Sequence, residues 1–239
     1  MRTGIIFVVA FLLFVSTGIE AKGPTSAVVS VSWDISLDAD GHVTKLTTKD
    51  ERVPKLHALL EKAIRGWHFS PGTVNGQPAA TESHVQTRLD IRLVGNGYEV
   101  WVLGAATGAS YGKTTPPHYP DAAARAGKQG EVVLIAHYNG AGAVTDVAPY
   151  EHGPKADVQF AQAAMTSVRK WTFATEVVGG HGVAGTALIP VCFSLHGFPP
   201  PACDWKWKNP ATGESSSAGQ AVALNPAAKL ESDVIGHAL

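Results

Sequence analysis

The chain has few cysteines, no long apolar run and almost no net charge, and each shortage excludes a class of protein. Its two cysteines cannot supply a four-ligand structural zinc site, and no histidine spacing nearby completes one. Its apolar run, Ile5–Val15, is shorter than the roughly 20 residues that a membrane-spanning helix needs, so we expect no stable membrane span. The net charge is −1 and the basic residues are scattered, so we expect no nucleic-acid partner.

The first 21 residues have the composition of a secretory signal peptide. Arg2 supplies a positive start, the apolar run follows, and Ser16–Ala21 turns small and polar. We therefore expect export to the periplasm, with residues 1–21 removed and the mature chain beginning near Lys22. The alternative is an uncleaved segment that anchors the chain at the inner membrane, because Ile19-Glu-Ala21 departs from the usual cleavage pattern.

A strand–strand–helix–strand order is predicted in the first part of the chain. Val29–Asp38 alternates apolar and polar residues, which is typical of a strand with one buried face. Asp40-Gly41 supplies a hairpin turn to a return strand. Apolar residues from Leu56 to Trp67 have helical spacing. A last strand is predicted over Val85–Leu93, which alternates again.

The same order returns roughly a hundred residues later, which indicates a tandem duplication of a β-β-α-β unit. Arg65-Gly-Trp-His-Phe69 at the end of the first helix matches Arg169-Lys-Trp-Thr-Phe173 at the end of the second. The predicted fold class is α+β, with two tandem units that each pack one helix on a small antiparallel sheet. Large aromatic residues are expected to fill the cores: Trp33, Trp67, Phe69, Phe160, Trp171 and Phe173.

The duplication divides the chain into five predicted segments. They are a signal peptide at 1–21, a first unit at 22–95, an extra strand with a glycine-rich linker at 96–115, a second unit at 116–198 and a C-terminal segment at 199–239. The last segment is rich in Ala, Ser and Gly, and we expect a disulfide-closed loop followed by a mobile tail. Cys192 is expected to face away from the helix, and the prolines after Phe198 return Cys203 to that face. A bridge between the two cysteines is therefore predicted in an oxidising compartment.

Four motifs lie in order along the second unit. They are an opening Tyr119-Pro120, a short helix that ends in Gly127-Lys-Gln-Gly130, the helix end Arg169-Lys-Trp-Thr-Phe173 and the closing strand Ile189-Pro-Val-Cys-Phe193. In this combination they resemble the C-terminal domain of the TonB energy-transducer family. The first unit is similar but has no Tyr-Pro segment before its first strand, so it resembles a degenerate copy.

The resemblance implies a protein-binding function without catalysis. Members of this family are understood to add an extended segment of an outer-membrane transporter to a sheet edge, where backbone hydrogen bonds supply affinity. The expected partner is therefore a protein, such as a TonB-dependent transporter or another envelope protein, and the chain is expected to be an accessory or adaptor in TonB-dependent transport. The residues assigned to partner binding lie in the opening segment and the closing strand: Pro117, His118, Tyr119, Pro120, Leu188, Ile189, Val191 and Phe193.

Two alternatives stay open for this surface. Exposed strand edges are usually protected, so Tyr119 would pack on the sheet and the edge would be covered within the chain. Pro190 also removes one backbone donor from the closing strand. The two units are further expected to dock on each other through strand edges, which gives a monomer and leaves partner binding to the second unit.

Three motifs that suggest chemistry lack the context that the chemistry needs. Gly108-Ala-Ser-Tyr-Gly112 matches the serine-hydrolase elbow, but prolines follow where a helix should begin. The histidines of the second unit do not have metal-binding spacing. Asp38-Ala-Asp-Gly41 is half of a calcium loop and is typical of a hairpin turn. No catalytic residue, metal site or cofactor is therefore predicted. The rival function is a periplasmic enzyme or metal-binding protein that uses the histidine-rich second unit.

Overall fold

The computed structural model describes residues 26–48, 54–195, 203, 207–208, 215–216 and 220–239. The predicted signal peptide at 1–21 lies outside these residues, as does most of the stretch 196–219. Across the part that is described, no helix has both the length and the apolar character needed to cross a bilayer.

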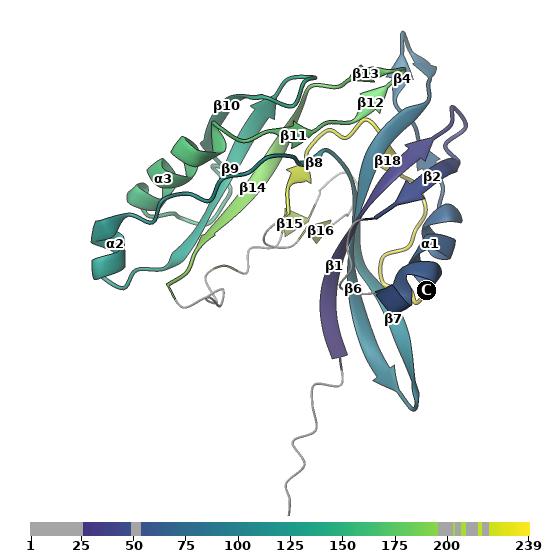
Figure 1. The fold of residues 1–239 in the computed structure, drawn as a ribbon, viewed down its shortest axis with the longest axis horizontal. Helices are drawn as coiled ribbons and strands as arrows, with labels where there is room; N and C mark the ends of the chain where they lie inside the picture. Colours follow the sequence, from purple (N-terminus) through teal and green to yellow (C-terminus); the bar gives the residue numbers. More distant parts are fainter. Residues whose placement is uncertain (1–25, 49–53, 196–202, 204–206, 209–214, 217–219) are drawn as a thin grey trace, which may run out of the picture.

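The first half of the chain, residues 26–108, is one antiparallel sheet with a helix on one face (Figure 1). Its strands run in the order β2–β1–β6–β7. Their bounds are β1 Ser26–Leu37, β2 Val43–Thr47, β6 Thr81–Val94 and β7 Gly97–Gly108. The connection between β2 and β6 contains η1 Pro54–Leu56, α1 His57–Arg65, β3 Phe69–Ser70, β4 Thr73–Val74 and β5 Gln77–Pro78.

The second half, residues 109–195, has the same order of long elements. Its antiparallel sheet runs β10–β9–β14 and is extended by β17 from the C-terminal segment. The bounds are β9 Gly130–Tyr138, β10 Val144–Pro149, β14 Gly185–Phe193 and β17 Val222–Ala223. The remaining elements are β8 Ser110–Tyr111, α2 Asp121–Arg125, α3 Val158–Val168, β11 Phe173–Ala174, β12 Val177–Val178 and β13 His181–Gly182.

Each half has its own hydrophobic core between its helix and its sheet. The six aromatic residues expected in the cores are all buried. α1 contributes Leu60 and Ile64 to the first core, and α3 contributes Phe160 and Ala164 to the second, which is the apolar stripe that helical spacing predicted. The observed class is therefore mixed, with strands dominant and few helices.

The two halves are joined by strand pairing. β12 of the second half pairs with Thr81 and Glu82 of β6, so it enters the sheet of the first half. β18 (Lys229–Leu230), which follows the second half, pairs with β3 of the first. Inside the second half, β8 pairs with β11 in the matching position. In each half the short strand after the helix therefore has a two-residue strand as its partner, and in the first half that partner comes from the C-terminal segment.

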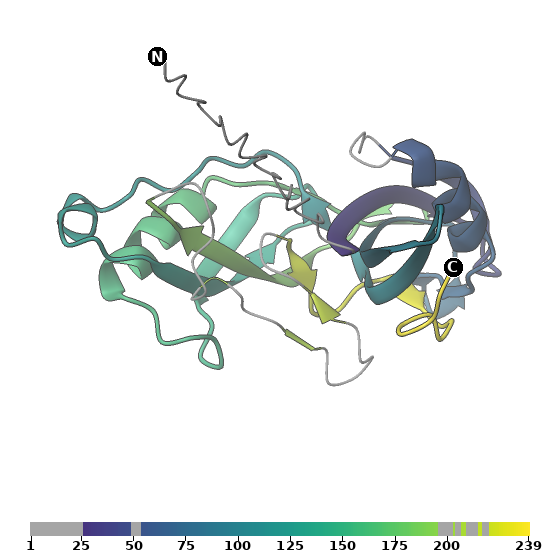
Figure 2. The same cartoon turned by 90° about the horizontal axis from the view of Figure 1, so that it is seen from below.

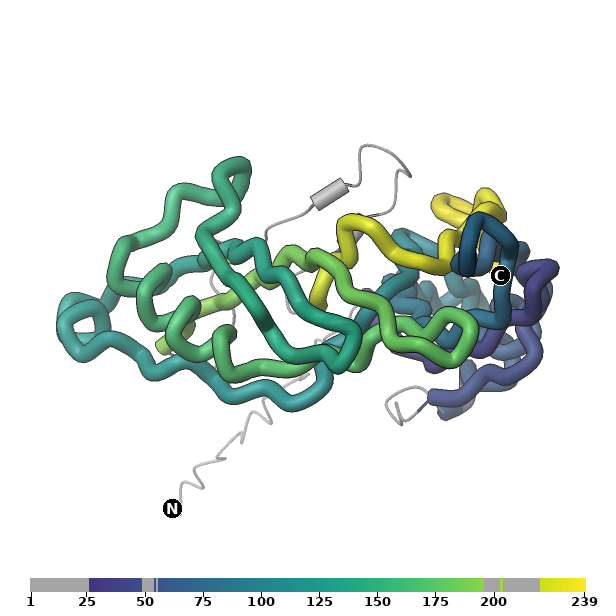
Figure 3. The backbone as a smooth tube through the Cα atoms, turned by 90° about the horizontal axis from the view of Figure 1, so that it is seen from above, coloured from purple at the N-terminus to yellow at the C-terminus, as the bar shows by residue number. Residues whose placement is uncertain are grey.

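The C-terminal segment differs from the expected mobile tail over residues 220–239, which we call the C-terminal strap. It runs from β17 on the second half to β7 on the first, where Val102 N–H donates to the His237 carbonyl (Figures 2 and 3). Its buried residues are Ala221, Val222, Ala223, Ala228 and Val234. Small side chains let it approach other backbones closely: a Cβ on Gly108 would lie 2.4 Å from that of Ala223. The composition that suggested disorder instead suits a narrow space.

In the segment predicted as an extra strand and a glycine-rich linker, residues 97–108 form the strand β7, and the difference lies in the linker. β7 is a full strand of the first sheet and pairs with β6 from His84 to Val94. After it, Ala109 is buried and β8 is paired. The first structural half therefore extends to Gly108 instead of ending at residue 95, because the alternation of residues 98–106 continues the sheet.

Candidate protein-binding site

The opening segment is fastened to the second sheet by Tyr119. The Tyr119 ring lies edge-on to Phe160 of α3 at 5.5 Å and to Phe193 of β14 at 5.6 Å, measured between ring centroids. Its hydroxyl donates a hydrogen bond to the carbonyl oxygen of Lys128. Two of the predicted contacts, Tyr119 and Phe193, are therefore neighbours, and Tyr119 packs on the sheet as the alternative interpretation proposed.

The residues beside Tyr119 line an open groove against α3. The His118 side chain is 86% exposed, and its Nε2 lies 3.7 Å from the Asp121 carboxylate. The groove has a volume of about 500 Å³. His118 and Pro120 form one wall together with Thr115 and Pro116, and the other wall consists of α3 side chains: Gln159, Gln162, Ala163 and Thr166. Pro117 is half-buried beside it.

The closing strand β14 keeps its apolar side chains inside the protein. Leu188, Ile189, Val191 and Phe193 are all buried, and Cys192 is the exposed residue between them. Ile189, Val191 and Phe193 belong to the core under α3, while Leu188 packs with Val222 on the opposite face of the sheet. These side chains are not available to a partner, so recognition at this strand has to use its backbone.

The outer edge of β14 is covered at its start by the C-terminal strap. Ala187 and Leu188 pair with β17, Leu224 N–H donates to the Thr186 carbonyl at 2.9 Å, and Asn225 Oδ1 accepts from Thr186 N–H at 3.2 Å. From Ile189 to Phe193, β14 pairs only with β9 among the described residues. The alternative interpretation expected this edge to be covered within the chain but did not identify the covering segment, for which the only local signal is the short apolar stretch 221–224.

The predicted bridge between Cys192 and Cys203 is present, and no described cysteine is free. Cys192 is exposed, on the side of β14 away from α3, while Cys203 is buried. The Cys203 sulfur lies 3.4 Å from the carbonyl oxygen of Gly130, the β9 residue that pairs with Phe193. The bridge therefore lies at the end of β14, beside the start of β9, while the strap pairs with the start of β14.

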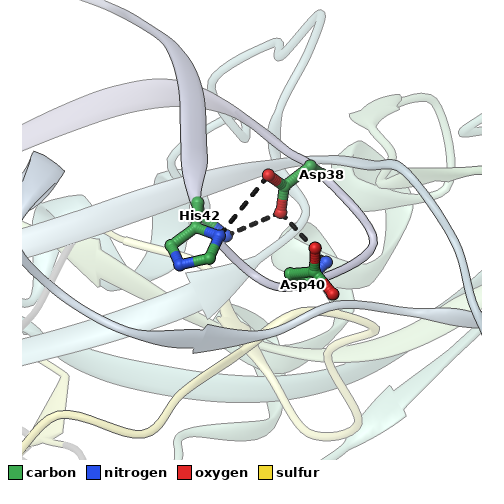
Figure 4. A group of neighbouring side chains, drawn as sticks. All are labelled: Asp38, Asp40 and His42. Atoms are coloured by element: carbon green, nitrogen blue, oxygen red, sulfur yellow. Dashed lines mark hydrogen bonds and ion pairs between the residues drawn. The ribbon is translucent and has the colours of Figure 1, made fainter.

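The acidic turn after β1 brings Asp38, Asp40 and His42 together (Figure 4). Asp38 Oδ1 accepts from the N–H groups of Asp40 at 3.0 Å and His42 at 2.9 Å, and the His42 N–H lowers the pKa of the Asp38 carboxyl. In the matching turn after β9, Asn139 Oδ1 accepts from Ala141 and Ala143 in the same way. A neutral amide does the same work there, so this geometry closes a turn and does not indicate an ion.

The possible hydrolase elbow has a different structure from a strand-to-helix turn. Ser110 lies in β8 and pairs with Ala174 of β11. A nucleophile elbow needs the serine exposed at a sharp turn before a helix. Here the serine is part of a strand that joins the linker to the second half, so the motif is structural.

Comparison with known proteins places one family on the second half. Residues 115–195 match the family described as Gram-negative bacterial TonB protein C-terminal. Protein TonB from two strains of Xanthomonas campestris pv. campestris is 40% identical over 94 residues, which cover 39% of this chain and 41% of each relative. The chain thus spans about two-fifths of the length of these curated relatives. The solution NMR structure of Pseudomonas aeruginosa TonB CTD is 26% identical with a TM-score of 0.32, covering 38% of this chain and 89% of that one.

Proposed function

Since residues 115–195 belong to the TonB C-terminal domain family, we propose that the chain is a non-enzymatic protein-binding module of the cell envelope that serves TonB-dependent energy transduction. The observation that carries this proposal is the extent of the match. It begins at the opening segment, includes α2, β9, β10 and α3, and ends after the closing strand β14. It therefore includes both elements to which partner contact was assigned.

The partner adds an extended segment to the outer edge of β14 between Ile189 and Phe193. This mode draws its affinity from backbone hydrogen bonds, and the burial of the β14 side chains suits it because only the backbone is offered. Backbone groups that point outward alternate with those that bond to β9, and Thr186 already points outward to the strap, so Pro190 and Cys192 are the residues of this stretch that face the open edge. Pro190 contributes no donor, so the added strand bonds to the Pro190 carbonyl and to the N–H and carbonyl of Cys192. The partner's flanking residues lie in the groove between His118 and α3.

The partner class follows from the family. We infer an extended segment of an outer-membrane transporter, or of another envelope protein, and a periplasmic location for the second half. The chain acts as an accessory or adaptor. It matches about two-fifths of the length of the relatives, so we do not transfer the energy-coupling role of those whole proteins to it.

The first half is a degenerate duplicate that serves as a scaffold. Its elements follow the same order as those of the second half, and their helix ends receive short strands in matching positions. Docking through β12 and the strap uses strand edges that would otherwise pair with another chain. The full chain is therefore a monomer whose binding surface lies on the second half.

Photo-crosslinking from the groove tests this proposal. A photo-reactive phenylalanine analogue replaces His118, and a matched variant carries it at His152, which is also exposed but lies in the loop before α3. We expect the full chain in intact envelopes to give a protein adduct from position 118, identified by mass spectrometry as an outer-membrane transporter or another envelope protein. Adducts of equal yield from both positions, or none from position 118, would contradict the assignment.

A further inference from the structure

The β6–β7 hairpin carries apolar side chains beyond the core that it helps to build. Leu93, Val94 and Tyr98 lie beside its turn and are 55%, 50% and 64% exposed. We call these three residues the hairpin tip. In Figure 1 the ends of β6 and β7 project past α1, so this helix does not cover them.

Two residues of the hairpin tip, Leu93 and Tyr98, continue the row of residues that forms the first core, while Val94 points to the other face of the sheet. Across the β6–β7 pair, Leu89 faces Val102 and Ile91 faces Val100, and the next pair outward is Leu93 with Tyr98. Leu89, Val102 and Val100 are buried. Opposite residues in antiparallel strands share a face of the sheet, so one apolar row runs from the core into solvent.

The charged groups near the tip are already paired within the hairpin. Arg92 Nε lies 2.7 Å from the Asp90 carboxylate, and its guanidinium stacks over the Trp101 ring at 4.9 Å. Trp101 Nε1 donates to Glu99 at 3.3 Å. The tip therefore presents apolar atoms without an excess of positive charge, and its partner has to be recognised through apolar contact.

The start of β1 lies at the same end of the sheet. Ser26 pairs with Arg92, which precedes Leu93. Ten residues, 16–25, separate β1 from the apolar run Ile5–Val15. Ten extended residues span at most about 35 Å, so in a chain that keeps the apolar run as an anchor, the alternative to its removal, the bilayer lies within that reach of the hairpin tip.

We propose that the hairpin tip contacts the surface of a lipid bilayer. Leucine and valine at a turn can enter the boundary between headgroups and acyl chains, and tyrosine suits that boundary because one end of its ring is apolar and the other polar. Three side chains at the end of a hairpin offer far less than the roughly 800 Å² per partner that a stable protein dimer buries. A bilayer has no such minimum area, which favours it over a second copy of the chain.

This contact places the first half at a membrane surface while the second half carries the partner site. It is independent of the strand-addition proposal, since no residue of the hairpin tip belongs to the groove or to β14. Failure of the His118 crosslink would leave it unchanged.

Photo-crosslinking to lipid tests the proposal directly. The full chain, reconstituted with phosphatidylcholine vesicles, carries the photo-reactive phenylalanine analogue at Tyr98 or, as the control, at Val74. Val74 is 44% exposed and lies in β4, at the opposite end of the first half (Figure 1). We expect lipid adducts from position 98 to exceed those from position 74 by roughly tenfold. Equal lipid yields, or a chain-to-chain adduct from position 98, would overturn the proposal, and the second result would assign the tip to self-association.

Vesicle flotation of the exported chain supplies the second measurement. We expect Leu93→Ser, Val94→Ser and Tyr98→Ser together to reduce the bound fraction roughly tenfold, because each removes apolar area from the contact. The matched variant Val74→Ser with Val158→Ser, which alters two other exposed valines, keeps the bound fraction of the original chain. Binding to phosphatidylcholine should persist at high salt. Binding that needs anionic lipid, or that the three serines leave unchanged, would refute the apolar contact.

Discussion

Glu176 lies where both halves and the C-terminal strap meet, and its replacement probes how they are held together. The residue is 4% exposed. Its carboxylate accepts from Ser83 Oγ of the first half at 2.7 Å, and from Ala227 N–H at 2.6 Å and Ala228 N–H at 3.0 Å in the strap. Glu176→Ala would leave all three donors without this acceptor.

The cost follows from the number of buried donors. Each buried group left without a partner costs about 1–3 kcal/mol, and such losses are not fully additive, so we expect Glu176→Ala to lower the free energy of unfolding by about 3–5 kcal/mol. Ser83→Ala removes one donor and should cost about 1 kcal/mol. The matched control Glu151→Ala alters an exposed glutamate and should change stability by less than about 0.5 kcal/mol.

The assay is urea unfolding of the full chain at neutral pH, followed by tryptophan fluorescence. Because Glu176 joins separate parts, its loss should also split the transition, with the strap and one half unfolding before the other. A change below about 0.5 kcal/mol for Glu176→Ala, with a single unaltered transition, would refute the role given to this carboxylate.

Three further outcomes are expected. Replacing Cys192 and Cys203 together by serine should lower the free energy of unfolding by about 3 kcal/mol, since the bridge closes a loop with a sequence separation of 11 residues. The original chain, denatured without reduction, should show no free thiol, and two labelled thiols would contradict the bridge. Gly142→Ala should lose more than about 1 kcal/mol in chemical unfolding, because φ is +82° and a Cβ would lie 2.0 Å from the Phe173 carbonyl oxygen, while Gly180→Ala, at φ +84° with no atom near, should lose less. The Lys128 ammonium and the Gln159 N–H lower the pKa of Asp157. The Asp157 carboxylate therefore contributes to stability above its unfolded pKa, near 4, and this contribution is lost as the pH falls through the folded value. Asp157→Asn should make the free energy of unfolding less dependent on pH in the acid range, and an unchanged dependence would contradict this.

Local patterns predicted the long elements because one buried face leaves a periodic record in the sequence. The alternation of Val29–Asp38 and the helical stripe from Leu56 to Trp67 depend only on near neighbours. The matching hairpin turns after β1 and β9 also depend on near neighbours, since Asp38 and Asn139 each accept hydrogen bonds from the backbone N–H groups two and four residues later. Tyr119 and Phe193 were named as candidate residues, and the structure brings them together.

The contacts between distant segments left no such record. Glu176 meets Ser83 across 93 residues and the strap across 51 and 52, and its neighbours give no sign that it is buried. β17 and β18 have two residues each, too few for a period to appear. The strap was therefore predicted to be a mobile tail rich in small residues, and the structure identifies it as the segment that covers the start of β14.

Strand addition at β14 is the central claim, and hydrogen exchange tests it most directly. Exchange of the full chain is measured alone and with a peptide that has the sequence of the partner segment crosslinked from position 118. We predict slower exchange at the Cys192 amide, the one N–H of residues 189–193 that points away from β9, with no change along β10 or β2. Protection of the β10 or β2 edge, with residues 189–193 unaffected, would contradict the account.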